Sequence, residues 1–211
     1  MSKQLKTIRF IVTTAIFAAI ATILYVVPVF NFALPIFPDF LKIHLDEIPI
    51  FILGFASGPW AAVFGLVIKT LIKLPMTHTM CLGELTDLIY SAAFILPCVF
   101  LYKYSKNKQK GMIFGLLIGL LSQLIVSFFL NIFVMFPFYA WIFNTDMATI
   151  QSICHNFNPL VSDPIWTIGL FIVLPFNLIK DAAAFIIVVP VSLSLKVIFD
   201  RYNKQENTKE A

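Results

Sequence analysis

Six long runs of apolar residues, separated by short polar or proline-rich connectors, set the pattern along this chain. About 20 apolar residues in a helix cross the hydrocarbon core of a bilayer, so each run predicts one membrane-spanning helix, some of them short or tilted. The runs cover residues 8–29, 45–58, 60–74, 84–104, 111–139 and 164–199. We therefore expect an all-α membrane protein in which residues 1–211 form a single domain, a six-transmembrane-helix bundle.

The second and third runs are separated only by Ser57-Gly58-Pro59, where the proline suits the first turn of a new helix. One span over residues 48–72 is the alternative. The basic residues favour the break, because they gather before the first run, in the connector 103–110 and after the last run. Six spans place these three groups on one side of the membrane. Since Lys and Arg collect in cytoplasmic loops, both termini are predicted to be cytoplasmic.

The composition argues against a water-soluble domain. Hydrophobic residues make up 60% of the chain and charged residues only 12%, about half the share that is usual in soluble domains. The net charge of +4 comes from the clusters that flank the predicted spans, so it does not indicate nucleic-acid binding. The lipid bilayer is the expected surrounding of this chain.

Motifs for catalysis and for metal binding are missing from the sequence. The three cysteines form no CxxC, and the three histidines (His44, His78 and His155) lie in different connectors without ligand spacing. No GxxxxGK[ST], HExxH or GxSxG occurs. We expect a non-catalytic protein without metal or cofactor, so any energy for transport must come from a partner or an ion gradient.

A polar stripe in the last run is the strongest sign of a site. Asn177, Lys180, Asp181 and Ala184 share one face of the predicted helix. An ionisable side chain at membrane depth costs roughly 2.5–3.5 kcal/mol unless it faces protein or water. We expect the stripe to line a pocket in the bundle, with Lys180 either contacting a polar ligand or paired with Asp181.

Charged residues near the ends of other runs add to this picture. Lys69 and Lys73 end the third run, while Glu84 and Asp87 open the fourth, so these charges are placed to pair and form one wall of a cavity. Interfacial snorkelling and helix capping are the alternatives. Asp46-Glu47 is interpreted as the N-terminal cap of the second helix.

Two further features each have two explanations. Asn131 is a lone amide in a very apolar run, so it either hydrogen-bonds to another helix or contacts a heterocyclic ligand. Ala15 and Ala19 are four residues apart in the first run and present a flat strip to another helix. That helix belongs either to this bundle or to another membrane subunit.

Four segments, in this order, carry a resemblance to a known family: FLKIHLDEIPIFILGFASGPWAAVFGLVIKTLI, GELTDLIY, LNIFVMFPFY and LPFNLIKD. They resemble the substrate-binding S components of energy-coupling factor (ECF) vitamin transporters, most closely the riboflavin-specific RibU type. The resemblance implies a six-helix, multi-pass protein of the bacterial cell membrane. The resemblance further implies that this protein captures a vitamin from outside, under the loop between the first two helices.

The resemblance also implies roles for particular residues. Asn131 and Lys180 match positions that hold the polar edge of a flavin ring. Asn177 and Glu84 lie in matching pocket motifs. Ala15 and Ala19 match a strip that docks on a transmembrane coupling subunit, the T component. Two cytoplasmic ATPases would then drive uptake. The expected substrate-binding residues are Asn131, Lys180, Asn177, Glu84, Phe40, Leu41 and Asp181. The alternatives are an S component for folate, pantothenate or pyridoxine, or an autonomous carrier coupled to protons.

Overall fold

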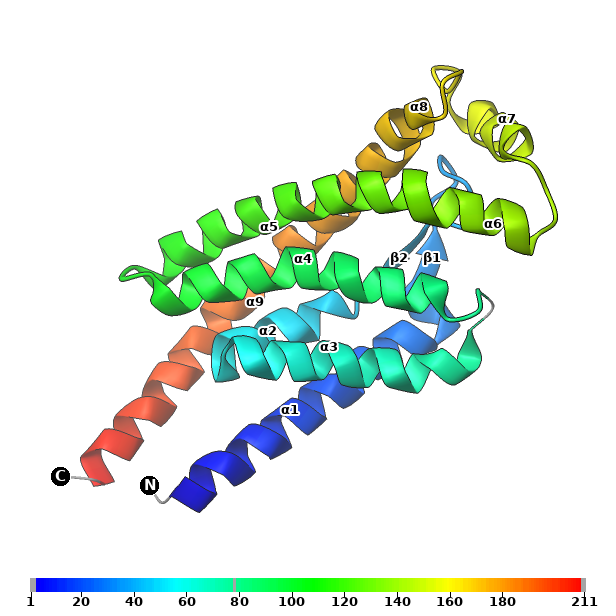
Figure 1. Ribbon diagram of the computed structural model, residues 1–211. Coiled ribbons are helices and arrows are strands. Elements are labelled where there is room, and N and C mark those ends of the chain that lie inside the picture. The colour runs from blue at the N-terminus through cyan, green and yellow to red at the C-terminus, as the bar shows by residue number, and fades with distance from the viewer. Residues whose placement is uncertain (1–2, 78, 210–211) are drawn as a thin grey trace.

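The computed structural model describes residues 3–77 and 79–209, and it is built almost entirely from helices (Figure 1). His78, one of the connector histidines, lies outside the described residues. The longer helices are α1 (Lys3–Val26), α2 (Glu47–Ser57), α3 (Pro59–Lys73), α4 (Leu82–Tyr104), α5 (Lys108–Leu130), α6 (Phe136–Ile142), α7 (Met147–Phe157) and α9 (Leu174–Lys209). Shorter elements are η1 (Pro28–Phe30), η2 (Leu74–Met76), η3 (Asn131–Met135), α8 (Trp166–Ile168) and η4 (Gly169–Val173).

The described residues contain five helical segments that are long and apolar enough to cross a membrane. These are Gln4–Val26, Pro59–Met76, Leu82–Tyr104, Lys108–Ile142 and Trp166–Ser194. The second predicted run forms α2, an apolar helix of only 11 residues. The predicted break between α2 and α3 is present, because Gly58 turns the chain with φ +91° and Pro59 opens α3. The structure thus gives five full-length segments and one shorter apolar helix.

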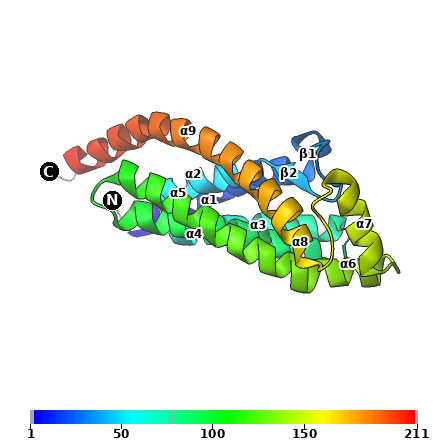
Figure 2. The same ribbon diagram turned by 90° about the horizontal axis from the view of Figure 1, so that it is seen from above.

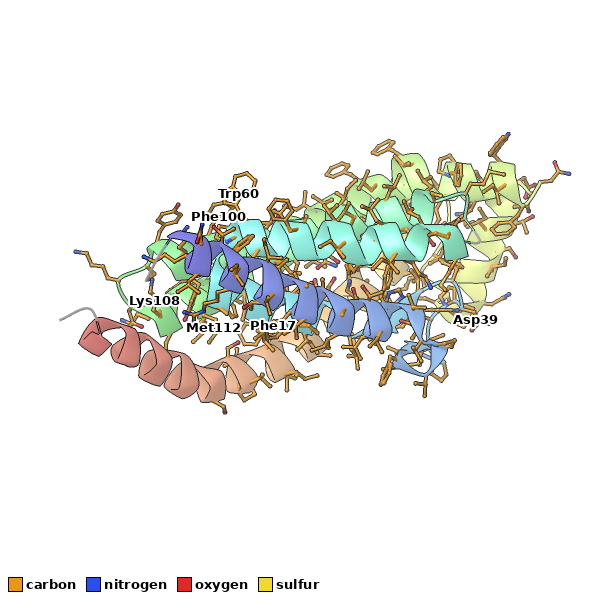
Figure 3. All side chains as sticks on the ribbon, turned by 90° about the horizontal axis from the view of Figure 1, so that it is seen from below. Phe17, Asp39, Trp60, Phe100, Lys108 and Met112 are labelled. Carbon is orange, nitrogen blue, oxygen red and sulfur yellow. The ribbon has the colours of Figure 1, made fainter. Side chains whose placement is uncertain are left out.

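The two ends of the bundle differ in what they carry. In Figures 1 and 2 both termini and the α4–α5 connector lie at one end, while α6, α7 and the strands lie at the other. Figure 3 places Lys108, at the start of α5, at the first end and Asp39 at the second. The basic clusters therefore share one end, as expected, and its cytoplasmic orientation stays a prediction.

A small sheet departs from the all-α expectation. Strands β1 (Asn31–Ala33) and β2 (Lys42–His44) pair antiparallel, with Asn31 opposite His44. They form a hairpin in the connector between α1 and α2. The hairpin folds over the end of the bundle that is opposite the termini (Figure 1).

Helix α7 also lies where only a connector was expected. It begins after Asp146, whose carboxylate accepts a hydrogen bond from the Thr149 backbone N–H at 2.8 Å. Hydrogen bonding from Thr149 lowers the pKa of the Asp146 carboxyl. Ile150 and Cys154 are buried and attach α7 to a core cluster that includes Phe136 and residues of η4. Helix α7 is therefore a second cover at the hairpin end.

Helices α4 and α5 run side by side with their backbones in contact (Figures 1 and 2). A Cβ on Gly119 would stand only 2.1 Å from the carbonyl oxygen of Phe94, and one on Gly115 would stand 2.6 Å from Cα of Cys98. Only glycine permits this approach. The two helices therefore form one closely packed wall of the bundle.

Two π-helical segments interrupt the long helices at the hairpin end. Segment η3 ends two residues before Pro137, and η4 ends two residues before Pro175. A proline has no N–H and clashes with the carbonyl four residues before it, which the wider π turn relieves. Asn131 begins η3, and Asn177 follows Pro175 by two residues. Both amides therefore lie in or next to an irregular turn.

Candidate ligand-binding site

A cavity of about 790 Å³ lies at the hairpin end. Side chains from α1, the hairpin loop, α3, α4, η3, α6, α7 and α9 line it. Asp39, labelled in Figure 3, belongs to this lining. Its size is typical of sites for small organic molecules, which are mostly apolar with a few polar groups that fix orientation.

Six of the seven residues predicted to bind substrate line this cavity. They are Phe40, Leu41, Glu84, Asn131, Asn177 and Lys180. The seventh, Asp181, is not among the lining residues. Its side chain is 0% exposed and neither carboxyl oxygen has a hydrogen bond of normal geometry within the described part of the chain. The predicted contacts therefore converge from four elements, with Asp181 behind them.

Lys180 is paired, but not with its neighbour in the sequence. Its Nζ donates to Oε1 of Glu47 at 3.0 Å. Ser91 Oγ donates to the same oxygen, also at 3.0 Å. Of the two alternatives for Lys180, pairing with Asp181 is not what the structure shows, because the ion pair is formed with Glu47 at the start of α2. One ammonium hydrogen is used in this way, and the other two have no hydrogen-bond partner among the described residues.

Lys69 is the centre of a second buried cluster. Its side chain is 0% exposed, and its Nζ contacts Asp46, Oδ2 of Asp87 at 3.3 Å and Oγ of Ser91 at 3.4 Å. The predicted pairing of Lys69 with Asp87 is confirmed. Because Ser91 also touches Glu47, the two clusters form one charge network that ties α2, α3, α4 and α9 together.

Asp46-Glu47 was interpreted as the N-terminal cap of α2, but the side chains of these two residues do not cap the helix. Asp46 stands at the N-cap position of α2, yet its carboxylate makes no capping hydrogen bond. The two carboxylates instead contact Lys69 and Lys180. A buried lysine attracts a carboxylate strongly, because water does not screen the pair.

Glu84 has a different set of partners from the one expected. Its Oε2 accepts hydrogen bonds from Thr77 Oγ1 at 2.7 Å and from Thr79 Oγ1 at 3.2 Å. Lys73 instead lies over the ring of Tyr25, with Nζ 5.4 Å from the centroid. The predicted pairing of Glu84 with a lysine is wrong, and the short α3–α4 connector holds this carboxylate.

Both explanations of Asn131 fit the structure. Its Nδ2 donates to Tyr90 Oη on α4 and to the backbone carbonyl of Ser127, each at 2.8 Å. The residue also lines the cavity. The amide therefore links two helices and also forms part of the cavity wall.

Several lining residues were missed by the sequence analysis, among them Tyr25, His44, Tyr90, Tyr139 and Thr149. The ring of His44 lies 5.3 Å from that of Tyr25, and burial lowers the pKa of His44. The tyrosines lie inside apolar runs, where the pattern alone does not separate them from core aromatics. Tyr90 could have been identified from the sequence, because it lies close to the candidate residues Glu84 and Asp87 on the same predicted helix.

The alanine strip of α1 faces away from the bundle. Ala15 and Ala19 are exposed, whereas Ala18 and Ala21 are 1% and 0% exposed and pack inward. Within the described residues, the outer strip therefore has no covering helix.

Comparison with known proteins identifies the family. Residues 9–192 match the family described as ECF transporter, substrate-specific component. The chain is 28% identical over 181 residues to the riboflavin transporter FmnP of Bacillus subtilis (strain 168), an alignment that covers 84% of this chain and 88% of that protein. It is 27% identical over 170 residues to the riboflavin transporter RibU of Staphylococcus aureus (strain TCH60), covering 81% of each chain.

A solved structure shares the fold. It was reported under "Structure and mechanism of the S component of a bacterial ECF transporter" and superimposes with a TM-score of 0.70 at 24% sequence identity. The match covers 91% of this chain and 98% of that one. The chain belongs to the family of ECF transporter substrate-specific components, and it is a multi-pass protein of the bacterial cell membrane.

Proposed function

We propose that this protein is the riboflavin-binding S component of an ECF importer and that the cavity at the hairpin end is the vitamin site. The supporting observation is the convergence of Lys180, Asn131, Asn177 and Glu84 on one cavity with aromatic residues beside them. A planar heterocycle suits such a site, because aromatic side chains pack on its faces and a few polar groups fix its edge. The two relatives described above are riboflavin transporters, which favours a flavin.

The loop between β1 and β2 provides the cover in this proposal. Phe40 in this loop lines the cavity, with its ring 6.3 Å from those of Phe136 and Tyr139. Leu41 lies beside it in the lining. A ligand entering at this end would be enclosed between the hairpin and α7.

Purified protein is expected to bind riboflavin with one-to-one stoichiometry and to quench its fluorescence, because the ring would lie among aromatic side chains that exclude water. A fluorescence titration in detergent measures this. Competition with folate, pantothenate and pyridoxine is the control for substrate class. Binding of one of these vitamins without binding of riboflavin would refute the flavin assignment and leave the family assignment intact.

We also propose that the exposed strip of Ala15 and Ala19 docks on the transmembrane T component, whose two ATPases drive uptake. Ala19→Trp should abolish uptake by the complete transporter and leave riboflavin binding unchanged, because the larger ring prevents close helix contact. Radiolabelled uptake and the titration are compared for this variant and for Ile118→Trp, an exposed position on α5.

Retained uptake in Ala19→Trp would contradict docking through this strip. Vesicles that contain the protein alone are a second control, for which no uptake is expected. Uptake there, driven by a proton gradient, would support an autonomous carrier instead.

A further inference from the structure

The amide of Asn131 is held in one orientation. Its Nδ2 lies 2.8 Å from the backbone carbonyl oxygen of Ser127 and 2.8 Å from Tyr90 Oη. A backbone carbonyl only accepts hydrogen bonds, so a reversed amide would bring two acceptor oxygens within 2.8 Å of each other. The Ser127 carbonyl therefore selects the orientation, and Tyr90 uses the second amide hydrogen.

This arrangement decides what Asn131 offers to a ligand. Both hydrogens of its Nδ2 are committed, and in the described part of the chain Oδ1 has no donor. Asn131 is only 7% exposed, but it belongs to the cavity lining. The group left for a ligand is the acceptor Oδ1, which suits an N–H of the ligand.

Tyr90 offers the complementary group beside it. Its oxygen accepts from Asn131 through a lone pair, so the phenol keeps its own hydrogen. Tyr90 also lines the cavity, and its hydroxyl has no other hydrogen bond in the described residues. The cavity wall thus presents an acceptor and a donor next to each other.

We propose that Tyr90 is a positioning and specificity-determining residue, and that the Tyr90–Asn131 pair selects ligands that present an N–H beside a carbonyl. The imide edge of a flavin has this pattern, with a second carbonyl on the other side of its N–H. Lys180 supplies further donors for that second carbonyl, since one ammonium hydrogen is held by Glu47. The choice of a flavin rests on the proposed function, whereas the polarity of Asn131 rests on the geometry alone.

The test compares riboflavin with riboflavin methylated on its imide nitrogen. Methylation replaces the N–H by an apolar group and leaves Oδ1 of Asn131 without a donor, so the wild-type protein should bind the methylated flavin about tenfold more weakly or worse. Fluorescence titration gives both dissociation constants. This part of the experiment needs no variant and does not depend on how a mutant folds.

Tyr90→Phe tests the role of the hydroxyl. Without it the amide keeps only its hydrogen bond to Ser127 and can turn about that bond, so riboflavin affinity should fall about tenfold. The discrimination against the methylated flavin should become smaller, but it should not vanish, because the Ser127 carbonyl still disfavours the reversed amide. A residue with only a structural role would not change that ratio. The matched control is Tyr139→Phe, which removes a hydroxyl from another lining tyrosine and should keep the discrimination.

Each outcome distinguishes the inference from the function on which it rests. Failure to bind riboflavin would overturn both. Equal affinity of the wild-type protein for riboflavin and its methylated form would overturn the inference alone. So would a Tyr90→Phe variant with unchanged affinity and unchanged discrimination.

Discussion

Lys180→Met should lower riboflavin affinity about 10- to 100-fold, because it removes the charged hydrogen bond that we propose Lys180 makes to the ligand, and methionine cannot replace it. Lys180 lines the cavity and is only 6% exposed. The same change leaves Glu47 without its lysine, which should lower the free energy of unfolding by about 3–5 kcal/mol. Fluorescence titration and thermal unfolding in detergent measure the two effects.

A second substitution separates these effects. In Lys180→Met/Glu47→Gln the buried charge is removed together with its partner, so stability should recover while affinity stays low. Lys73→Met is the matched control, since Lys73 lines the same cavity without a described ion pair and contacts the Tyr25 ring. Full recovery of affinity in the double variant would show that Lys180 acts only through Glu47.

Lys69→Met should act mainly on stability. Lys69 is fully buried, contacts both Asp46 and Asp87, and is not among the residues that line the cavity. Its removal leaves the buried carboxylate of Asp46 and the half-buried one of Asp87 without this cation, which we expect to cost about 3–5 kcal/mol of unfolding free energy or to prevent folding. The measurement is the yield of folded protein and its unfolding midpoint.

Neutralising the carboxylates tests whether charge is the cause. Lys69→Met combined with Asp46→Asn and Asp87→Asn should restore most of the lost stability, because no buried charge remains unpaired. If this combination is no more stable than Lys69→Met alone, packing of the lysine stem rather than its charge holds the cluster together.

The helices and the main polar stripe could be predicted from the sequence. Apolar runs of membrane length have few alternatives to a helix, since lipid offers no partner for backbone N–H and C=O groups. A lysine inside such a run must face protein, a rule that pointed to Lys180 before its surroundings were known. The turn between α2 and α3 could also be predicted locally, because Gly58 and Pro59 interrupt the apolar run there.

The partners of the charged residues could not be predicted in the same way. Lys180 and Glu47 are 133 residues apart, and only the packing of α9 on α2 brings them together. Asp181 is adjacent to Lys180 in the sequence, but it is not among the residues that line the cavity. Asp46-Glu47 was interpreted as a helix cap because acidic residues are favourable at any helix start, whether or not a buried lysine lies nearby.

Some features were present in the sequence and were missed. Gly111, Gly115 and Gly119 repeat at intervals of four, the pattern of closely packed membrane helices. Asp146 before an apolar pattern at helical spacing is a start signal for α7. The hairpin strands have three residues each, too few for a periodic pattern.

The central claim is that the cavity at the hairpin end holds a flavin by its imide edge. Native mass spectrometry of the protein extracted from its own cells tests this most directly, because the ligand is then chosen by the protein. We predict a bound species with the mass of riboflavin, which is lost in Lys180→Met. A co-purified vitamin without an imide edge, or riboflavin retained equally by the variant, would contradict the account.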